Sequence, residues 1–218
     1  MKYLLILFIM ISLSGCTIYR NLSEEDKLEF QLEKIDLKNH ENQPDSLLYS
    51  IDSEELKKLM LSSEKKYHLV IMHTRTCRGC VYSMDKLTRY LDKIQNTSIY
   101  FITQSDQTRK EMYVNYYADL PYKRYMLDSE KYNFDRIDGA LGQSHGAKDK
   151  FIAELCKDCI GLYGTFGLML FDKAGNNVFF TDSEYLSKVY IANDRDEDRY
   201  LNQLGPKLFS DITKITNK

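Results

Sequence analysis

The sequence predicts an α/β protein with a central mixed sheet flanked by helices. Apolar segments typical of strands alternate with amphipathic segments typical of helices, which favours parallel strands joined by helical crossovers. Near the C-terminus, two apolar segments are separated by the short turn KAGN, which adds an antiparallel hairpin to the sheet. Hydrophobic residues make up 43% of the 218 residues, which is enough for a folded core.

The first half of the domain is expected to begin near Ser46 with a short strand, SLLYSI. Asp52 and Glu55 then have the spacing of a capping box in front of a helix. Residues 67–73, YHLVIMH, form a continuous apolar run, as expected for a strand in the middle of a sheet. The segment after them is predicted to be a second helix. Its apolar side chains recur at helical spacing, at Val81, Met84, Leu87, Leu91 and Ile94.

The second half supplies the rest of the sheet. Residues 98–103 predict a strand, and the tyrosine-rich stretch after them, to about residue 155, is interpreted as an insertion. Within it, RYMLD favours a strand and HGAKDKFIAEL a helix. GLMLFD and NVFF form the predicted hairpin. A C-terminal helix, LNQLGPKLFSDITKI, is expected to bend or break at Gly205 and Pro206.

The N-terminus has the layout of an export signal. Residues 1–15 carry one lysine and a short apolar run, and the sequence LSGC that ends at Cys16 resembles the bacterial lipobox. That resemblance implies cleavage before Cys16 and acylation of this cysteine, with palmitate as an expected chain. The protein would then be lipid-anchored to a bacterial membrane, on its periplasmic or extracellular face, within the cell envelope. A plain secretory signal or a short anchor is the alternative.

The polar residues 16–45 are interpreted as the lipidated N-terminus and a tether, so that the domain spans residues 46–218. Cleavage would leave 218 − 15 = 203 residues and, because Lys2 is lost, would change the formal net charge from −2 to −3. The chain has no basic stripe, which argues against a nucleic-acid partner. No phosphate-binding loop, Ser-His-Asp arrangement or paired-carboxylate site stands out, and no cofactor is expected.

The other four cysteines form two CxxC pairs, and an exported compartment permits disulfides. Cys77 and Cys80 follow the predicted strand 67–73 and precede a helix. Unpaired backbone N–H groups and the helix dipole at that position stabilise a thiolate, and Arg75 and Arg78 add positive charge nearby. Cys80 lies one turn after Cys77 and can close a disulfide with it. This strand–CxxC–helix order is typical of a thioredoxin-like redox motif.

Two segments, HLVIMHTRTCRGC and YGTFGLMLFDKAGNNVFF, resemble the thioredoxin superfamily, especially its membrane-anchored bacterial members. The resemblance runs from about Ser46 to the C-terminus. It implies a thioredoxin-like fold, with an insertion before the loop that carries the family's cis-proline. It also implies two kinds of partner: proteins whose thiols or disulfides are exchanged, and an unidentified redox partner. By this resemblance Cys77 is the exposed attacking thiol and Cys80 the buried resolving thiol. Thr165 and Phe166 correspond to the substrate-binding loop.

The chain departs from the family pattern at two positions. Thr76 stands where an aromatic residue usually precedes the first cysteine, and Phe166 stands where the cis-proline is expected. A cis bond before a residue other than proline costs about 2.5–4 kcal/mol, so the Thr165–Phe166 bond is expected to be trans. The alternative to an enzyme is therefore a non-catalytic binding lipoprotein of the same fold, with structural disulfides.

The second pair, Cys156 and Cys159, lies shortly before Phe166 and has three interpretations. We favour a structural disulfide that holds this loop. A second redox pair that exchanges with Cys77 and Cys80 is also consistent with the spacing. A zinc site with all four cysteines is disfavoured, because 156 − 80 = 76 positions separate the pairs, against roughly 15–20 in common zinc modules. No metal is therefore expected.

Overall fold

The computed structural model describes residues 33–44, 47–73, 87–103, 122–132, 142–159, 166–193 and 197–217. The strands in these ranges are β1 (Glu33–Lys34), β2 (Leu48–Ile51), β3 (Tyr67–His73), β4 (Thr97–Thr103), β5 (Arg124–Leu127), β6 (Phe166–Asp172) and β7 (Asn177–Phe180). The helices are η1 (His40–Asn42), α3 (Ser53–Ser62), α6 (Ser129–Tyr132), α7 (Gly142–Leu155), α8 (Ser183–Ala192) and α9 (Glu197–Thr216). A further short helix covers residues 87–91.

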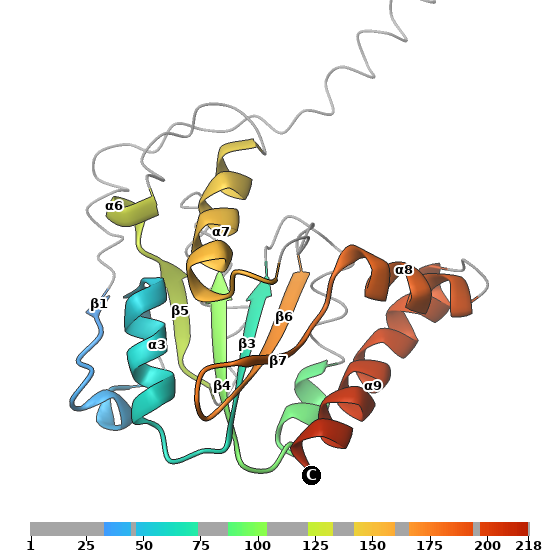
Figure 1. Cartoon of the computed structure of the whole chain (residues 1–218), viewed down its shortest axis with the longest axis horizontal. Helices are drawn as coiled ribbons and strands as arrows, with labels where there is room; N and C mark the ends of the chain where they lie inside the picture. Colours follow the sequence, from blue (N-terminus) through green and yellow to red (C-terminus); the bar gives the residue numbers. More distant parts are fainter. Residues whose placement is uncertain are drawn as a thin grey trace, which may run out of the picture.

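All of these strands belong to one sheet, in the order β1-β2-β5-β4-β3-β6-β7 (Figure 1). The strands from β1 to β3 in this order pair in parallel, whereas β6 is antiparallel to β3 and β7 to β6. Helices cover both faces of the sheet. The predicted α/β class, a central mixed sheet flanked by helices, is confirmed.

The two faces of the sheet carry separate cores. α3 and α7 pack against one face, and their buried side chains contact alternate residues of the central strand such as Val70 and Met72. The helix 87–91, α8 and α9 pack against the other face, which includes Leu69 and Ile71. β3 is thus buried on both sides, which explains why the sequence shows an uninterrupted apolar run there.

Local sequence signals set several element ends. The Asp52 carboxylate accepts a 2.8 Å hydrogen bond from the Glu55 N–H, and Glu55 accepts a 3.0 Å bond from the Asp52 N–H, so the predicted capping box starts α3. The hairpin between β6 and β7 is also confirmed. Gly175 in its turn has φ +83°, a conformation that favours glycine.

The C-terminal helix differs from the prediction. α9 continues through Pro206 as one helix instead of breaking there. Proline removes one backbone donor, but Leu204, Leu208 and Ile212 on either side of it are almost fully buried against the sheet. This packing outweighs the lost hydrogen bond. The sequence analysis also did not identify α8 as a separate helix.

The insertion and the predicted tether both contribute to the sheet. β5 lies between β2 and β4, and all four of its residues are buried. Residues 33–44, which the sequence analysis assigned to the tether, pair with β2 through β1 and pack Ile35 and Leu37 against the core. Part of the polar N-terminal stretch is therefore integrated into the folded domain.

Candidate functional site

The predicted redox pair follows the central strand of the sheet. β3 ends at His73, and Cys77 and Cys80 lie in residues 74–86, outside the described residues. The chain is described again from residue 87, where a helix packs Leu87 and Leu91 against the sheet. The structure thus describes a strand before the CxxC segment and a helix after it, while the start of that helix relative to Cys77 stays a prediction. In open sheets with parallel strands, ligands usually bind at this carboxyl edge.

The strand that follows the predicted substrate loop lies directly beside β3. The antiparallel register pairs His73, the last residue of β3, with Phe166, the first residue of β6. Thr165 lies outside the described residues, and so does the Thr165–Phe166 peptide bond. The register nevertheless brings the ends of the two segments that carried the family resemblance to the same edge of the sheet.

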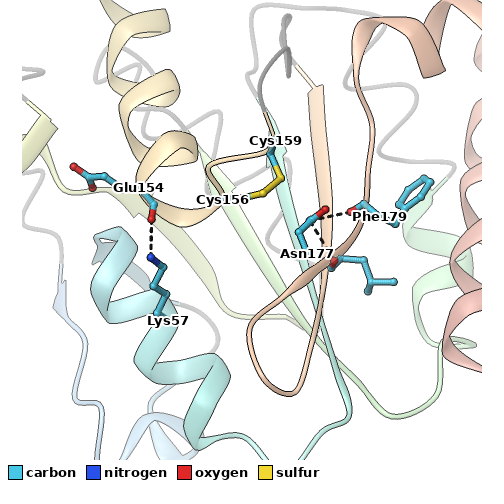
Figure 2. The surroundings of a disulfide bond; sticks show 7 residues. Lys57, Glu154, Cys156, Cys159, Asn177 and Phe179 are labelled. Atoms are coloured by element: carbon cyan, nitrogen blue, oxygen red, sulfur yellow. Dashed lines mark hydrogen bonds between the residues drawn. A yellow bond between two sulfur atoms is a disulfide. The ribbon is translucent and has the colours of Figure 1, made fainter.

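The second cysteine pair forms a disulfide just beyond the last turn of α7 (Figure 2). The Cα atoms of Cys156 and Cys159 are 5.4 Å apart. The Cys156 N–H donates to the Ile152 carbonyl and the Cys159 N–H to the Cys156 carbonyl, so the bridge closes a tight turn at the helix end.

This disulfide is part of the core on the α3 and α7 face of the sheet. Cys156 is 8% exposed and Cys159 only 1%. A zinc site would need both sulfur atoms as thiolates, whereas here they are bonded to each other. Within the ranges that the structure describes, no group of three or more cysteine, histidine or carboxylate side chains is arranged to hold a metal. The burial of the pair favours a structural role.

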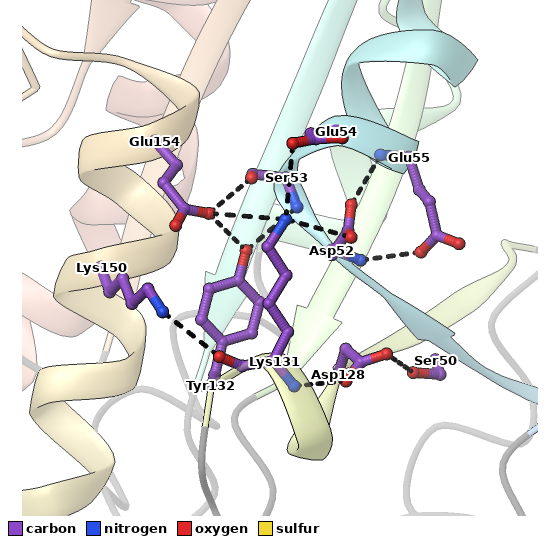
Figure 3. Close-up of polar contacts among 10 residues, drawn as sticks. All are labelled: Ser50, Asp52, Ser53, Glu54, Glu55, Asp128, Lys131, Tyr132, Lys150 and Glu154. Atoms are coloured by element: carbon purple, nitrogen blue, oxygen red, sulfur yellow. Dashed lines mark hydrogen bonds and ion pairs between the residues drawn. The ribbon is translucent and has the colours of Figure 1, made fainter.

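A polar cluster that the sequence analysis did not identify lies at the carboxyl ends of β2 and β5 (Figure 3). It links the first turn of α3, the short helix α6 and the last turn of α7. Glu154 is central to it and accepts hydrogen bonds from Ser53 Oγ at 2.7 Å and Tyr132 Oη at 2.9 Å. Lys131 Nζ lies 3.1 Å from the Asp52 carboxylate and 3.9 Å from that of Glu154.

The electrostatics of this cluster favour its charged form. Burial opposes ionisation of Glu154, but the hydrogen bonds from Ser53 and Tyr132 and the positive charge of Lys131 hold its pKa below the usual value. Burial also raises the pKa of Tyr132 to about 12, so its hydroxyl remains a donor at neutral pH. The cluster joins three helices by hydrogen bonds. In the sequence only the capping box at Asp52 gave a sign of it.

One histidine is buried near the amino end of the central strand, β3. His68 is fully buried, its ring lies 6.2 Å from that of Tyr100, and neither ring nitrogen has a hydrogen-bond partner among the described residues. Burial lowers its pKa to about 4, so His68 is neutral at pH 7. His68 is a core residue, and its protonation at low pH would destabilise the fold. It lies far from the carboxyl end of β3, where the CxxC segment follows.

The segment that would carry the lipid anchor lies outside the described residues, since it precedes residue 33. Among the helices that the structure does describe, none combines the length and the apolar composition needed to cross a membrane. Membrane attachment through Cys16 therefore stays a prediction from the sequence.

No protein-family model and no curated protein matches the sequence. Solved structures with a similar fold include the following three. Two come from Bacteroides vulgatus: a candidate thiol-disulfide oxidoreductase (TM-score 0.35, 13% identity, 55% of this chain and 64% of that one) and the thioredoxin domain of a thiol-disulfide oxidoreductase (TM-score 0.38, 16% identity, 60% and 81%). The third is a candidate thioredoxin from Neisseria meningitidis (TM-score 0.34, 19% identity, 62% and 76%). The chain thus spans just under two thirds of the first of these proteins.

Proposed function

We propose that this chain is a lipid-anchored thiol–disulfide oxidoreductase of the cell envelope, with Cys77 and Cys80 as its redox pair. The observation that carries the proposal is the pairing of His73 with Phe166. β3 leads into the CxxC segment four residues later, and β6 begins at the position that corresponds to the substrate loop. This register supports a shared site at the carboxyl edge of the central strand.

The chemistry follows from the two thiols. The Cys77 thiolate attacks one sulfur of a substrate disulfide, which forms a mixed disulfide and releases the other substrate sulfur as a thiolate. The Cys80 thiolate then attacks the Cys77 sulfur, and the second substrate sulfur leaves. The substrate gains two electrons, and the protein is left with a Cys77–Cys80 disulfide that a dithiol partner protein reduces. In reverse, the same pair oxidises a substrate dithiol.

The proposal is tested by a redox titration of the full chain, purified in detergent and equilibrated in glutathione buffers. Free thiols are trapped by alkylation, and each cysteine pair is scored separately by mass. We expect Cys77 and Cys80 to interconvert reversibly at a potential within the range of known oxidoreductases, roughly −270 to −120 mV. The buried Cys156–Cys159 pair is an internal comparison and should stay oxidised over this range.

The alternative is a non-catalytic binding module with structural disulfides, and two observations favour it. Phe166 replaces the family's proline, and the one cysteine pair that the described residues contain is buried as a disulfide. A Cys77–Cys80 pair that stays oxidised in strongly reducing buffer would establish this alternative. Stoichiometric zinc in the purified protein, lost on Cys156→Ser, would instead establish a structural metal site.

The lipid anchor has its own test. Cells grown with labelled palmitate should incorporate the label into the wild-type protein, and the protein should sediment with membranes. Cys16→Ala should abolish the labelling and leave the signal uncleaved. Equal labelling of the variant would contradict acylation at Cys16 without affecting the redox proposal.

A further inference from the structure

A cavity of about 610 Å³ opens at the amino ends of β4 and β5. This volume is typical of sites for small molecules. β4 runs parallel to β3 over seven residues, so the amino edge lies about 20 Å from the carboxyl edge where the redox site is proposed. The cavity is therefore separate from that site.

The walls of the cavity come from four parts of the chain and are held by specific contacts. Residues 37–42 form one wall, the end of α3 another, and the first residues of β4 and β5 the floor. His40 Nε2 and Tyr125 Oη are 2.5 Å apart and their rings stack, while Lys123 Nζ donates to the Glu41 carbonyl at 3.2 Å. These contacts fix the wall 37–42 against the floor, so the cavity is preformed.

Two almost wholly buried tyrosines lie under the floor of the cavity. Tyr100 and Tyr125 are 4% and 1% exposed, and their rings lie 6.1 Å apart and tilted by 44°. Leu59, also in the lining, is 3% exposed. Burial raises the pKa of Tyr100 to about 12, so its hydroxyl is protonated at neutral pH and can donate a hydrogen bond. Because these side chains are almost wholly covered, the apolar surface open to a ligand comes from the half-buried Leu37, Ile99 and Tyr122 in the lining. A flat or apolar ligand body would be complementary to this surface.

The rim is positively charged. Three lysines line the cavity, Lys38, Lys65 and Lys123, against one carboxylate, Glu41, which leaves a surplus of 3 − 1 = 2 positive charges. Lys38 and Lys65 are exposed, and neither forms an ion pair with a carboxylate within the described part of the chain. Such a rim attracts anions and disfavours cations.

We infer that this cavity binds a small organic anion, with a carboxylate or phosphate group at the lysine rim and a flat, apolar body against Leu37, Ile99 and Tyr122. The inference does not depend on the proposed redox function, because the two sites lie at opposite edges of the sheet. Either oxyanion satisfies the lysines, and the experiment distinguishes between them.

The test is a nuclear magnetic resonance titration of the full chain in detergent, observed at backbone amides. The probes are 4-hydroxybenzoate, phenyl phosphate and the neutral 4-hydroxybenzamide. We expect at least one of the two anions to give saturable shifts at residues 37–42, 98–100 and 122–125, with a Kd below about 1 mM. The neutral amide should bind at least about fivefold more weakly, because it lacks the charge that the lysines attract. The tighter anion identifies the oxyanion class.

Three variants sharpen the result. The double substitution Lys38→Gln and Lys65→Gln should weaken anion binding about tenfold, since it removes the two exposed rim charges. Ser62→Trp, at an exposed position in the cavity lining, should block the cavity and abolish the shifts. Lys173→Gln is the matched control, because Lys173 is exposed in the β6–β7 turn and does not line the cavity.

Unchanged amide spectra away from the cavity would show that the exposed substitutions leave the fold intact. The inference is wrong if neither anion gives saturable shifts, if the neutral amide binds as well as the acids, or if the double lysine variant binds like the wild type. Cys77→Ser should bind the anion as the wild type does, so failure of the redox proposal and failure of this one are distinguishable.

Discussion

The Ser53 hydroxyl donates a 2.7 Å hydrogen bond to Glu154 Oε2, across 101 positions of sequence. Ser53 begins α3 and is 2% exposed, whereas Glu154 lies in the last turn of α7. The same carboxylate oxygen accepts a bond from Tyr132 in α6 (Figure 3). One acidic side chain therefore ties together the helices that follow β2 and β5 and the helix that precedes the disulfide.

We predict that Glu154→Ala lowers the free energy of unfolding by about 1–2 kcal/mol, because it leaves the buried Ser53 hydroxyl and the Tyr132 hydroxyl without their acceptor. Chemical denaturation at pH 7 measures the loss. Glu64→Ala, at an exposed position after α3, is the control and should change stability little. If the loss in Glu154→Ala is no larger than in the control, the cluster does not stabilise the fold.

The buried histidine predicts a pH dependence of stability. The pKa of His68 is lowered to about 4 in the folded chain, against 6.5 when unfolded. Between these values the unfolded chain binds more protons, so stability rises with pH in this window and is lost as pH falls from 6.5 toward 4. The expected loss from His68 at pH 5 is on the order of 1–2 kcal/mol relative to pH 7.

Denaturation of wild type and His68→Leu at pH 7 and pH 5 tests this. The leucine variant should lose less stability between the two pH values than the wild type, because it has no group to protonate at this buried position. His68→Gln keeps a polar side chain but does not titrate, and it separates polarity from charge. If both variants lose as much unfolding free energy between pH 7 and pH 5 as the wild type does, His68 is not the source of the pH dependence.

Local signals predicted much of the fold. The bounds of β3 follow from an apolar run buried on both faces, the start of α3 follows from the Asp52 capping box, and the final hairpin follows from its turn. Each of these features depends on residues that are close together in the chain, so it can be predicted from the sequence alone. The predicted redox pair depends on a local motif too, but Cys77 and Cys80 lie outside the described residues, so their role stays a prediction.

The features that the sequence did not predict depend on contacts between distant segments. The pairing of β5 with β2 joins Ile51 to Leu127, and no pattern near either residue specifies the partner. β1 has only two residues, both exposed, and its position depends on Ile35 and Leu37 packing against the core. The Glu154 cluster is assembled in the same way, from side chains that each look like ordinary surface residues in the sequence.

The Cys156–Cys159 disulfide is expected to contribute to stability but not to redox activity. We expect the double variant Cys156→Ser and Cys159→Ser to lose about 2 kcal/mol of unfolding free energy, because the bridge restricts the unfolded chain and both sulfur atoms are buried in the core. Exchange at Cys77 and Cys80 should keep its potential. Calorimetry and the glutathione titration measure the two quantities on the same protein.

The matched variant removes the proposed redox pair, Cys77 and Cys80, and keeps the Cys156–Cys159 disulfide. Cys77→Ser and Cys80→Ser should abolish exchange with little change in unfolding free energy. If removal of Cys156 and Cys159 shifts the Cys77–Cys80 potential or stops its turnover, then the second pair takes part in electron transfer and is not only structural.

Phe166 gives the most direct test of the proposed catalysis. Its backbone begins β6 opposite His73, and proline is tolerated at the first residue of a strand, so Phe166→Pro is compatible with the sheet. If the carboxyl edge of β3 is the proposed redox site, a proline there should help to align the substrate backbone and raise the rate of disulfide exchange several-fold. The rate of reduction of a disulfide-bonded peptide, with a regenerating dithiol, measures it.

Phe166→Ala is the matched control for this substitution, because it removes the aromatic ring without introducing a proline. A rate increase in Phe166→Pro but not in Phe166→Ala assigns the effect to the proline backbone and supports catalysis. A rate increase in both variants would mean that the bulk of the phenylalanine limits access to the thiols. If neither changes the rate, β6 does not contribute to exchange, and the non-catalytic binding module becomes the better account of this chain.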